Sequence, residues 1–261
     1  MEIERLGMGF DPAIATKWFT EHRSFTYQLT FGYLVSLALG QWFMKARDPL
    51  RLDQLLVLWN FGLASFSIFG TIVLIPDFLG SFSDGFFGSI CKAGNYFEGA
   101  TGYVVYLFMI SKAFELGDSL FLVLRKRRLI FLHWYHHATV LLNCWALAYP
   151  MKTAAIRWGT IVNLLVHSFM YSYYFFRSLK INVPSWIARG ITTLQIAQFL
   201  LGNLVTGIVF YYAFFDPKAG CEATQATAGV QVLLYFTYLI LFINFFYHTY
   251  VKKRRTLTKA D

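Results

Sequence analysis

Residues 129–151 read LIFLHWYHHATVLLNCWALAYPM and contain no Asp, Glu, Lys or Arg. A helix needs about 20 mostly apolar residues to cross the hydrocarbon core of a membrane, so this stretch is long enough. It nevertheless carries His133, His136 and His137. Ionisable side chains inside a membrane helix are costly and usually face the interior of a helical bundle or a cavity. The stretch therefore predicts a spanning helix and, on that helix, a polar site.

The remainder of the chain has the composition of a membrane protein. Of its 261 residues, 57% are hydrophobic and only 14% are charged, whereas a soluble domain carries roughly 25% charged residues. Disorder is excluded because 20% of the residues are aromatic. The predicted fold is all-α, a single polytopic membrane domain over residues 1–261 that has seven transmembrane helices. The predicted spans are about 24–44, 54–76, 99–124, 129–151, 158–176, 190–215 and 223–251.

The distribution of Lys and Arg between the loops predicts the orientation. The loops after the first, third and fifth spans, with the tail after residue 251, hold fifteen Lys and Arg, whereas the N-terminus and the alternate loops hold seven. Short cytosolic loops carry an excess of Lys and Arg. We therefore expect a lumenal N-terminus and a cytosolic C-terminus. The net charge of +9 lies in short gaps between apolar stretches, so we do not expect a nucleic-acid partner.

Two of the three cysteines fall in loops on the predicted lumenal side. Cys91 lies between the second and third spans, and Cys221 lies between the sixth and seventh. Because disulfides persist on the oxidising side of a membrane, these two cysteines are candidates for a disulfide. Two free thiols fit the sequence equally well. Cys144 lies within a span.

The third span is predicted to continue through charged residues. Its charge-free part, residues 99–111, is too short to cross a membrane, so the helix must extend through Lys112, Glu115 and Asp118. Lys112, Glu115 and Ser119 are spaced i, i+3 and i+7 and therefore share one helix face. We expect this face to point into the bundle. The alternative is a span that ends early and leaves these residues in solvent.

Three other spans also carry polar residues on one helix face. The groups are His133, His136 and His137; Asn163, His167, Met170, Tyr171 and Tyr174; and Thr192, Gln195, Gln198 and Gly202. Imidazoles at this spacing suit a nucleophile with a general base, a metal site, or simple packing. A stripe of Tyr and Met residues commonly serves only to pack one helix against another. Here Asn163 and His167 lie within the stripe, which favours a cavity lined by these side chains. Buried glutamine side chains form hydrogen bonds between helices as often as they contact a substrate.

These polar groups are predicted to lie at one depth. With a rise of 1.5 Å per residue, His136 lies about 12 Å from the basic residue that bounds its span. Glu115, His167 and Gln198 lie about 14–15 Å from theirs. Four separate helices thus place polar side chains in one layer below the cytosolic surface. This agreement indicates a single polar chamber that opens toward the cytosol.

A metal centre is one chemistry that such a chamber would suit. The His-X-X-His-His spacing resembles the boxes of membrane desaturases and hydroxylases, which carry more histidines in several boxes around two irons. This chain has six histidines in all, and only four lie in the predicted layer. That number is short for a di-iron centre, so we expect a metal-free histidine mechanism with no cofactor.

Four motifs in this sequence resemble those of the ELO fatty-acid elongases, the condensing enzymes of very-long-chain fatty-acid synthesis. They are Lys112-X-X-Glu115-X-X-Asp118-Ser119, His133-X-X-His136-His137, Asn163-X-X-Val166-His167-X-X-Met170-Tyr171-X-Tyr173-Tyr174 and Thr192-X-X-Gln195-X-X-Gln198. The resemblance covers most of the chain and keeps the order of the motifs. The family usually has Thr where this chain has Ser119, which keeps the hydroxyl. The residues around the histidines resemble the branch that acts on saturated and monounsaturated acyl chains of about palmitate length.

The resemblance implies an acyltransferase, a very-long-chain 3-oxoacyl-CoA synthase. Such an enzyme condenses long-chain acyl-CoA with malonyl-CoA and releases CO2 and CoA. The resemblance also implies an acyl tunnel within the bundle and residence in the endoplasmic reticulum membrane. Candidate partners are the two CoA substrates, membrane lipid, a second copy of the chain and other enzymes of the elongation cycle. In the tail, Lys259 is third from the end but lacks the second Lys of a full dilysine retrieval signal.

For this reaction the residues predict a two-step transfer. We expect His136 to attack the thioester and form an acyl-imidazole, with His167 as the partner that orients or accepts the acyl group. His133 and His137 would tune the nucleophile or act as acid and base. Lys112 either holds the malonyl carboxylate or pairs with Glu115. The expected substrate contacts are Lys112, Glu115, Asp118, Asn163, Tyr171, Tyr174, Gln195 and Gln198.

Two other functions fit parts of this pattern. A seven-span receptor or transporter would share the number of spans and the orientation. It would not explain a histidine cluster level with a Lys, Glu and Asp cluster near the cytosolic face. A metal-dependent membrane oxidoreductase would use the histidine box instead.

Overall fold

The computed structural model describes residue 7 and residues 9–252, and every regular element in this part of the chain is a helix. The all-α prediction is confirmed for these residues, while Lys259 and the tail lie outside them. The long helices are α3 (Arg23–Met44), α4 (Asp53–Gly80), α6 (Gly99–Leu124), α7 (Phe131–Leu142), α8 (Ile156–Ser178), α9 (Ser185–Phe215) and α10 (Gln225–Phe246). The short elements are α2 (Pro12–Glu21), η1 (Ser81–Asp84), α5 (Gly85–Cys91), η2 (Asn143–Ala148), η3 (Pro217–Ala219) and η4 (Tyr247–Lys252).

Each of the seven apolar stretches lies on a long helix. The π-helical segments η2 and η4 continue α7 and α10 and complete the fourth and seventh stretches. The third stretch does not end early, because α6 runs through Lys112 and Glu115 as far as Leu124. By length and composition, three helical segments of the described chain can cross a membrane: Asp53–Cys91, Ser185–Phe215 and Gln225–Lys252. The full count of seven spans stays a prediction.

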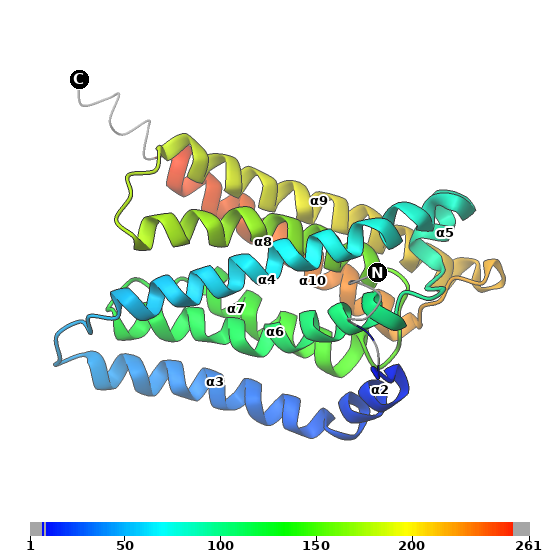
Figure 1. Ribbon diagram of the computed structural model, residues 1–261, viewed down its shortest axis with the longest axis horizontal. Helices are drawn as coiled ribbons and strands as arrows, with labels where there is room; N and C mark the ends of the chain where they lie inside the picture. Colours follow the sequence, from blue (N-terminus) through cyan, green and yellow to red (C-terminus); the bar gives the residue numbers. More distant parts are fainter. Residues whose placement is uncertain (1–6, 8, 253–261) are drawn as a thin grey trace.

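Six of the long helices form a closed ring. Going round it, α4 packs on α8, α8 on α9, α9 on α10, α10 on α7, α7 on α6, and α6 on α4. The remaining long helix, α3, packs outside this ring against α6 and α7, at the lower edge of the bundle in Figure 1. Side chains from six different helices line the centre of this ring, and the polar helix faces meet there.

The two ends of the bundle differ in chemistry. Loops 45–52, 125–130 and 179–184 lie together at one end with η4, at the left of Figure 1. We call this the basic end, because it gathers the Lys/Arg-rich loops. The opposite end carries α2, α5 and the loop 216–224. We call it the disulfide end for the reason given below.

Lysines in the left-handed conformation end two helices at the basic end. Lys126 follows α6 with φ 51°, and Lys180 follows α8 with φ 64°. After Lys126 the chain closes the helix in the usual way, since the N–H of Arg127 donates to the carbonyl of Leu122 at 2.8 Å. The Lys126 ammonium donates to the carbonyl of Arg47 at 2.8 Å. The turn after α6 therefore also holds the loop between α3 and α4.

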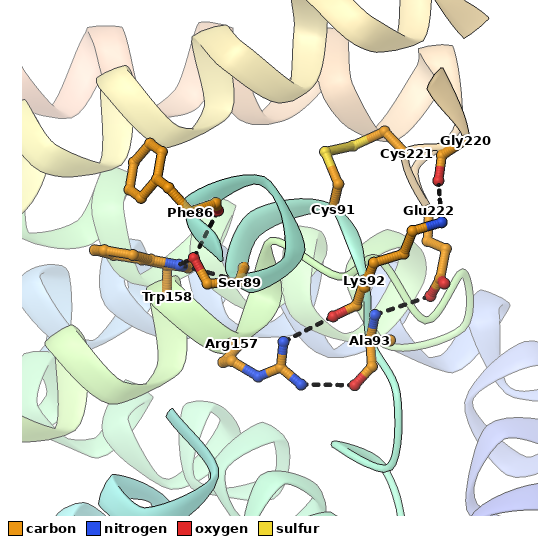
Figure 2. The surroundings of a disulfide bond; sticks show 10 residues. All are labelled: Phe86, Ser89, Cys91, Lys92, Ala93, Arg157, Trp158, Gly220, Cys221 and Glu222. Atoms are coloured by element: carbon orange, nitrogen blue, oxygen red, sulfur yellow. Dashed lines mark hydrogen bonds between the residues drawn. A yellow bond between two sulfur atoms is a disulfide. The ribbon is translucent and has the colours of Figure 1, made fainter. Parts of the chain in front are cut away.

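A disulfide links Cys91 to Cys221 at the opposite end, as Figure 2 shows. It joins the C-terminus of α5 to the loop between α9 and α10. The main chain reinforces this link, because the N–H of Glu222 donates to the carbonyl of Cys91 at 2.9 Å. The carboxylate of Glu222 accepts the N–H of Ala93, also at 2.9 Å. The structure thus contains the disulfide rather than two free thiols.

Arg157 holds the loop after α5 against the rest of the bundle. Its side chain is 4% exposed at the start of α8. The guanidinium donates to the carboxylate of Asp77 on α4 at 2.8 Å. It also donates to the carbonyls of Lys92 and Ala93 at 2.7 and 2.6 Å, as Figure 2 shows. A buried guanidinium requires such partners, because a charge without them is expensive to desolvate. The disulfide end is therefore a cross-linked and hydrogen-bonded cap.

We predict that removing the disulfide lowers the stability of this cap. Cys91 and Cys221 are 130 residues apart in the sequence, and loss of a cross-link that closes so long a loop costs about 2–5 kcal/mol. The Cys91→Ala/Cys221→Ala variant should therefore unfold at lower temperature than the wild type in the same detergent. Cys144→Ala, which removes a buried thiol but no cross-link, is the control. Equal melting temperatures for the double variant and the oxidised wild type would contradict the prediction.

Candidate functional site

Two cavities lie inside the ring of helices. The larger has a volume of about 550 Å³, is lined by residues from all six helices of the ring and reaches the basic end. The smaller has a volume of about 80 Å³ and lies between α6, α7, η2, α8, α9 and α10. The larger cavity has a basic rim that consists of Arg125, Arg127, Arg177 and Lys180. The predicted chamber is thus divided into a wide outer part and a narrow inner part.

The four histidines of the predicted layer lie together. His133, His136 and His137 on α7 and His167 on α8 all line the larger cavity. The ring centroids of His133 and His137 are 4.5 Å apart, and those of His136 and His137 are 5.4 Å apart. In the described part of the chain, no three His, Cys, Asp or Glu side chains are grouped so that they could hold a metal ion.

His136 differs from the other three because it also lines the smaller cavity. Its imidazole packs against the ring of Tyr238 from α10, with centroids 4.9 Å apart, and lies 6.1 Å from Phe199 of α9 and 6.2 Å from Phe242 of α10. Tyr238 is fixed in turn, since its hydroxyl shares a hydrogen bond with Thr139 at 2.8 Å. Aromatic rings from two helices therefore hold His136 at the junction of the two cavities.

A chain of polar contacts connects the charged face of α6 to His167. The ammonium of Lys112 donates to the Glu115 carboxylate at 2.7 Å and to Oδ1 of Asn163 at 2.8 Å. The amide nitrogen of Asn163 lies 3.2 Å from Nε2 of His167. The exposed fractions of Lys112, Glu115 and His167 are 3%, 4% and 7%, so this chain is shielded from solvent.

These contacts fix the proton arrangement on His167. Lys112 can only donate, so the oxygen of the Asn163 amide must face it and the NH2 group must face His167. Nε2 of a neutral His167 is then an acceptor, and the ring proton lies on Nδ1. That atom is 3.9 Å from Oε1 of Glu115. The carboxylate thus favours the tautomer that the amide requires.

The other carboxylate of α6, Asp118, holds aromatic donors. It accepts the indole N–H of Trp59 on α4 at 2.7 Å and the hydroxyl of Tyr171 on α8 at 2.8 Å. The Tyr171 ring packs edge-on against His167, with centroids 5.2 Å apart. Asp118 therefore connects α4, α6 and α8 close to His167.

The remaining predicted site residues divide between the two cavities. Tyr174 and Gln195 line the larger one, and the Gln195 amide donates to the sulfur of Met170 at 3.3 Å. Gln198 lines the smaller one, where its buried amide oxygen has no partner. Lys112 and Asn163 also line the smaller cavity. Glu115 lines neither of these two cavities, and its contacts are with its neighbours on α6 and with His167.

The aromatic residues that position this site could not be recognised from the sequence. Trp59, Tyr238 and Phe242 stand in stretches that contain many other aromatic residues, so no spacing distinguished them. Their roles depend on which helices are neighbours in the ring.

Comparisons with known proteins show which family the chain belongs to. The family model described as ELO: GNS1/SUR4 family matches residues 18–258. The chain is 43% identical to "Long chain fatty acid elongase 1" of Caenorhabditis elegans over 93% of this chain and 84% of that protein. It is 36% identical to "Very long chain fatty acid elongase 6" of Homo sapiens over 97% of this chain and 94% of that protein.

The chain therefore belongs to the ELO family of fatty-acid elongases. The resemblance seen in the four motifs is confirmed, and the protein is an enzyme of fatty-acid elongation.

We predict that the Lys112–Glu115 pair tolerates joint neutralisation better than loss of one partner. Their side chains are 3% and 5% exposed, and removing one member of a buried pair costs about 3–5 kcal/mol because the other charge stays buried alone. Unfolding in detergent should show that Lys112→Met and Glu115→Gln are each strongly destabilised. The double variant should recover much of the loss.

The exposed pair Lys17–Glu21 is the matched control. Its side chains are 74% and 57% exposed with a separation of 3.8 Å, so Lys17→Met should cost less than about 1 kcal/mol. If the Lys112→Met/Glu115→Gln variant is as unstable as the two single losses added together, the two residues do not compensate one another.

Proposed function

We propose that this protein is a 3-ketoacyl-CoA synthase, which condenses a long-chain acyl-CoA with malonyl-CoA and releases CO2 and CoA. The observation that carries the proposal is the position of His136 at the junction of a wide and a narrow cavity. An acyl-CoA has a bulky polar head and a thin apolar chain joined at the thioester. A nucleophile at such a junction meets the thioester when the head occupies the wide cavity and the chain the narrow one.

We further propose that all seven long helices span the endoplasmic reticulum membrane, with the basic end in the cytosol. Two independent features support this orientation. Short cytosolic loops are enriched in Lys and Arg, and these residues are concentrated at the basic end. Disulfides persist in oxidising compartments, and Cys91–Cys221 lies at the opposite end. The larger cavity would then receive both CoA substrates from the cytosol.

The first step is acyl transfer to His136. A neutral imidazole nitrogen attacks the thioester carbonyl, the carbon–sulfur bond breaks, and CoA leaves as the thiol with the proton that the imidazole gives up. The product is an acyl-imidazole whose chain enters the narrow cavity and widens it. His137 lies beside His136 and His133 lies beside His137, so these two imidazoles are placed to relay that proton.

The second step forms the carbon–carbon bond. Malonyl-CoA replaces CoA in the larger cavity, loses CO2 and becomes an enolate. The enolate carbon attacks the acyl carbon, the bond to His136 breaks, and the released ring nitrogen takes up one proton from water, which restores the neutral imidazole as 3-ketoacyl-CoA leaves. His167 lines the same cavity and has its tautomer fixed by Asn163 and Glu115, so it is suited to orient the malonyl group.

Polar groups around the junction would stabilise the charge that develops on the thioester oxygen. Lys112 and Gln198 both line the smaller cavity next to His136. The ammonium is held in place by Glu115 and Asn163 before substrate arrives, so it need not reorganise during the reaction. In this proposal Asp118, Tyr171, Tyr174 and Gln195 shape the larger cavity, where malonyl-CoA binds.

The basic rim of the larger cavity would bind the phosphates of CoA. Three of its residues are exposed at the cavity edge: Arg127, Arg177 and Lys180. The fourth, Arg125, forms a salt bridge with Asp53 at 3.1 Å. Exposed charges raise the local concentration of an oppositely charged substrate, and this effect weakens as salt is added.

We predict that His136→Ala abolishes condensation of acyl-CoA with labelled malonyl-CoA by the purified protein. It should also abolish exchange of labelled free CoA into acyl-CoA, because exchange requires the acyl-imidazole. His22→Ala is the control, since His22 is exposed and stacks on Trp18 in α2. Wild-type exchange by His136→Ala would rule out the acyl-imidazole. A purified wild type that releases no CO2 from malonyl-CoA in the presence of acyl-CoA would overturn the condensation proposal.

We predict that replacing Arg127 and Arg177 together by Gln raises the KM for acyl-CoA several-fold at low salt and changes kcat little. The difference from wild type should shrink as salt is added, because screening removes the same attraction. Lys218→Gln, an exposed charge at the disulfide end, is the control. A KM that is unchanged at low salt would place the phosphates elsewhere.

A further inference from the structure

Tyr235 of α10 is one of the aromatic side chains that line the narrow cavity. The cavity is lined by Gly159 of α8 and Gly202 of α9 as well as by Tyr235. A Cβ atom at Gly202 would lie 2.1 Å from both Cδ1 and Cε1 of the Tyr235 ring. A Cβ atom at Gly159 would lie 2.9 Å from the Tyr235 hydroxyl oxygen. The ring therefore rests on the backbone of α9 with its hydroxyl against α8.

Tyr235 lies beyond His136 as seen from the larger cavity. Tyr238, which packs on His136, is three residues further along α10 toward the basic end. Tyr235 is therefore about 4.5 Å nearer the disulfide end along the helix axis. An acyl chain that starts at His136 and runs along the narrow cavity toward the disulfide end would therefore lie against this ring.

The cavity ends in a tightly packed wall. Ala155 and Val205 line it and belong to a buried cluster with Ile90, Cys91 and Val209. The disulfide fixes this cluster, because Cys91 is one of its members. The helices around the wall are thus cross-linked at this end, and Tyr235 is a large lining side chain whose size changes the space left for a chain.

We propose that Tyr235, seated on Gly159 and Gly202, is the specificity-determining residue that limits the length of the acyl chain accepted beyond His136. This inference rests on the proposed function, since it takes the narrow cavity to be the place of the acyl chain. A smaller side chain at position 235 opens the cavity toward its end wall. A larger residue at position 202 displaces the ring from its seat into the cavity and shortens the space.

The test uses purified protein and straight-chain saturated acyl-CoAs of stepwise increasing length. Condensation with labelled malonyl-CoA is one readout, and thermal stabilisation by each acyl-CoA alone is the second, because a ligand that binds the folded state raises its melting temperature. In both readouts Tyr235→Ala should shift the preferred length upward by at least one elongation step. Gly202→Ala should shift it downward and lose the longest chains. Leu233→Ala, on the outer face of α10 with 61% of Leu233 exposed, should leave the profile unchanged.

The hydroxyl contact provides a second test that keeps the aromatic ring. Tyr235→Phe should retain nearly the wild-type length profile. Gly159→Ala should shift the profile in the wild-type background, but it should have little effect in the Tyr235→Phe background, where the atom that the new Cβ meets is absent. Non-additivity of this kind indicates direct contact.

The two readouts separate the inference from the proposed function. If wild type does not condense but its binding profile shifts with Tyr235→Ala, the condensation proposal fails and the role of Tyr235 stands. If Tyr235→Ala and Gly202→Ala both bind and elongate the same lengths as wild type, the role of Tyr235 is overturned while the condensation proposal stands.

Discussion

The site depends on a charge that is buried and must be paired. Lys112 lies in the middle of α6, where an ammonium without partners would be expensive to desolvate. Glu115 and Asn163 supply these partners from α6 and α8. The same contacts orient the Asn163 amide, and the amide orients the ring of His167. One electrostatic requirement therefore fixes two helices and one catalytic candidate, so the polar layer is part of the packing of the bundle.

The ring of helices separates this layer into two environments. Toward the basic end the cavity is wide, lined by histidines and rimmed by cations. Toward the disulfide end it is narrow and ends against small aliphatic side chains. His136 belongs to both, and aromatic rings from α9 and α10 hold it there. Such a division suits a substrate that is itself divided into a charged head and an apolar chain.

Much of this arrangement could be predicted from the sequence, because the helices are long and their polar faces follow helical periodicity. Helical spacing alone predicted that Lys112 lies beside Glu115, and the similar distances of His136 and His167 from the ends of their spans predicted that they lie in one layer. Periodicity acts within a helix, however, and does not say which helices are neighbours. The ring order, the division into two cavities and the seat of Tyr235 depend on how side-chain volumes fit between helices. Trp59 and Tyr238 could not be distinguished from other aromatic residues for the same reason.

At two lysines of the basic end, an unfavourable backbone conformation is accepted because the side chain has a role there. Lys126 and Lys180 adopt a left-handed conformation that costs an ordinary residue on the order of 1 kcal/mol and that glycine adopts freely. A glycine would relax the turn, but it would bring no cation. Lys126 uses its ammonium to fasten a neighbouring loop, and Lys180 brings its charge to the rim of the larger cavity. The entrance thus keeps its positive charge although the backbone at these two lysines is conformationally strained.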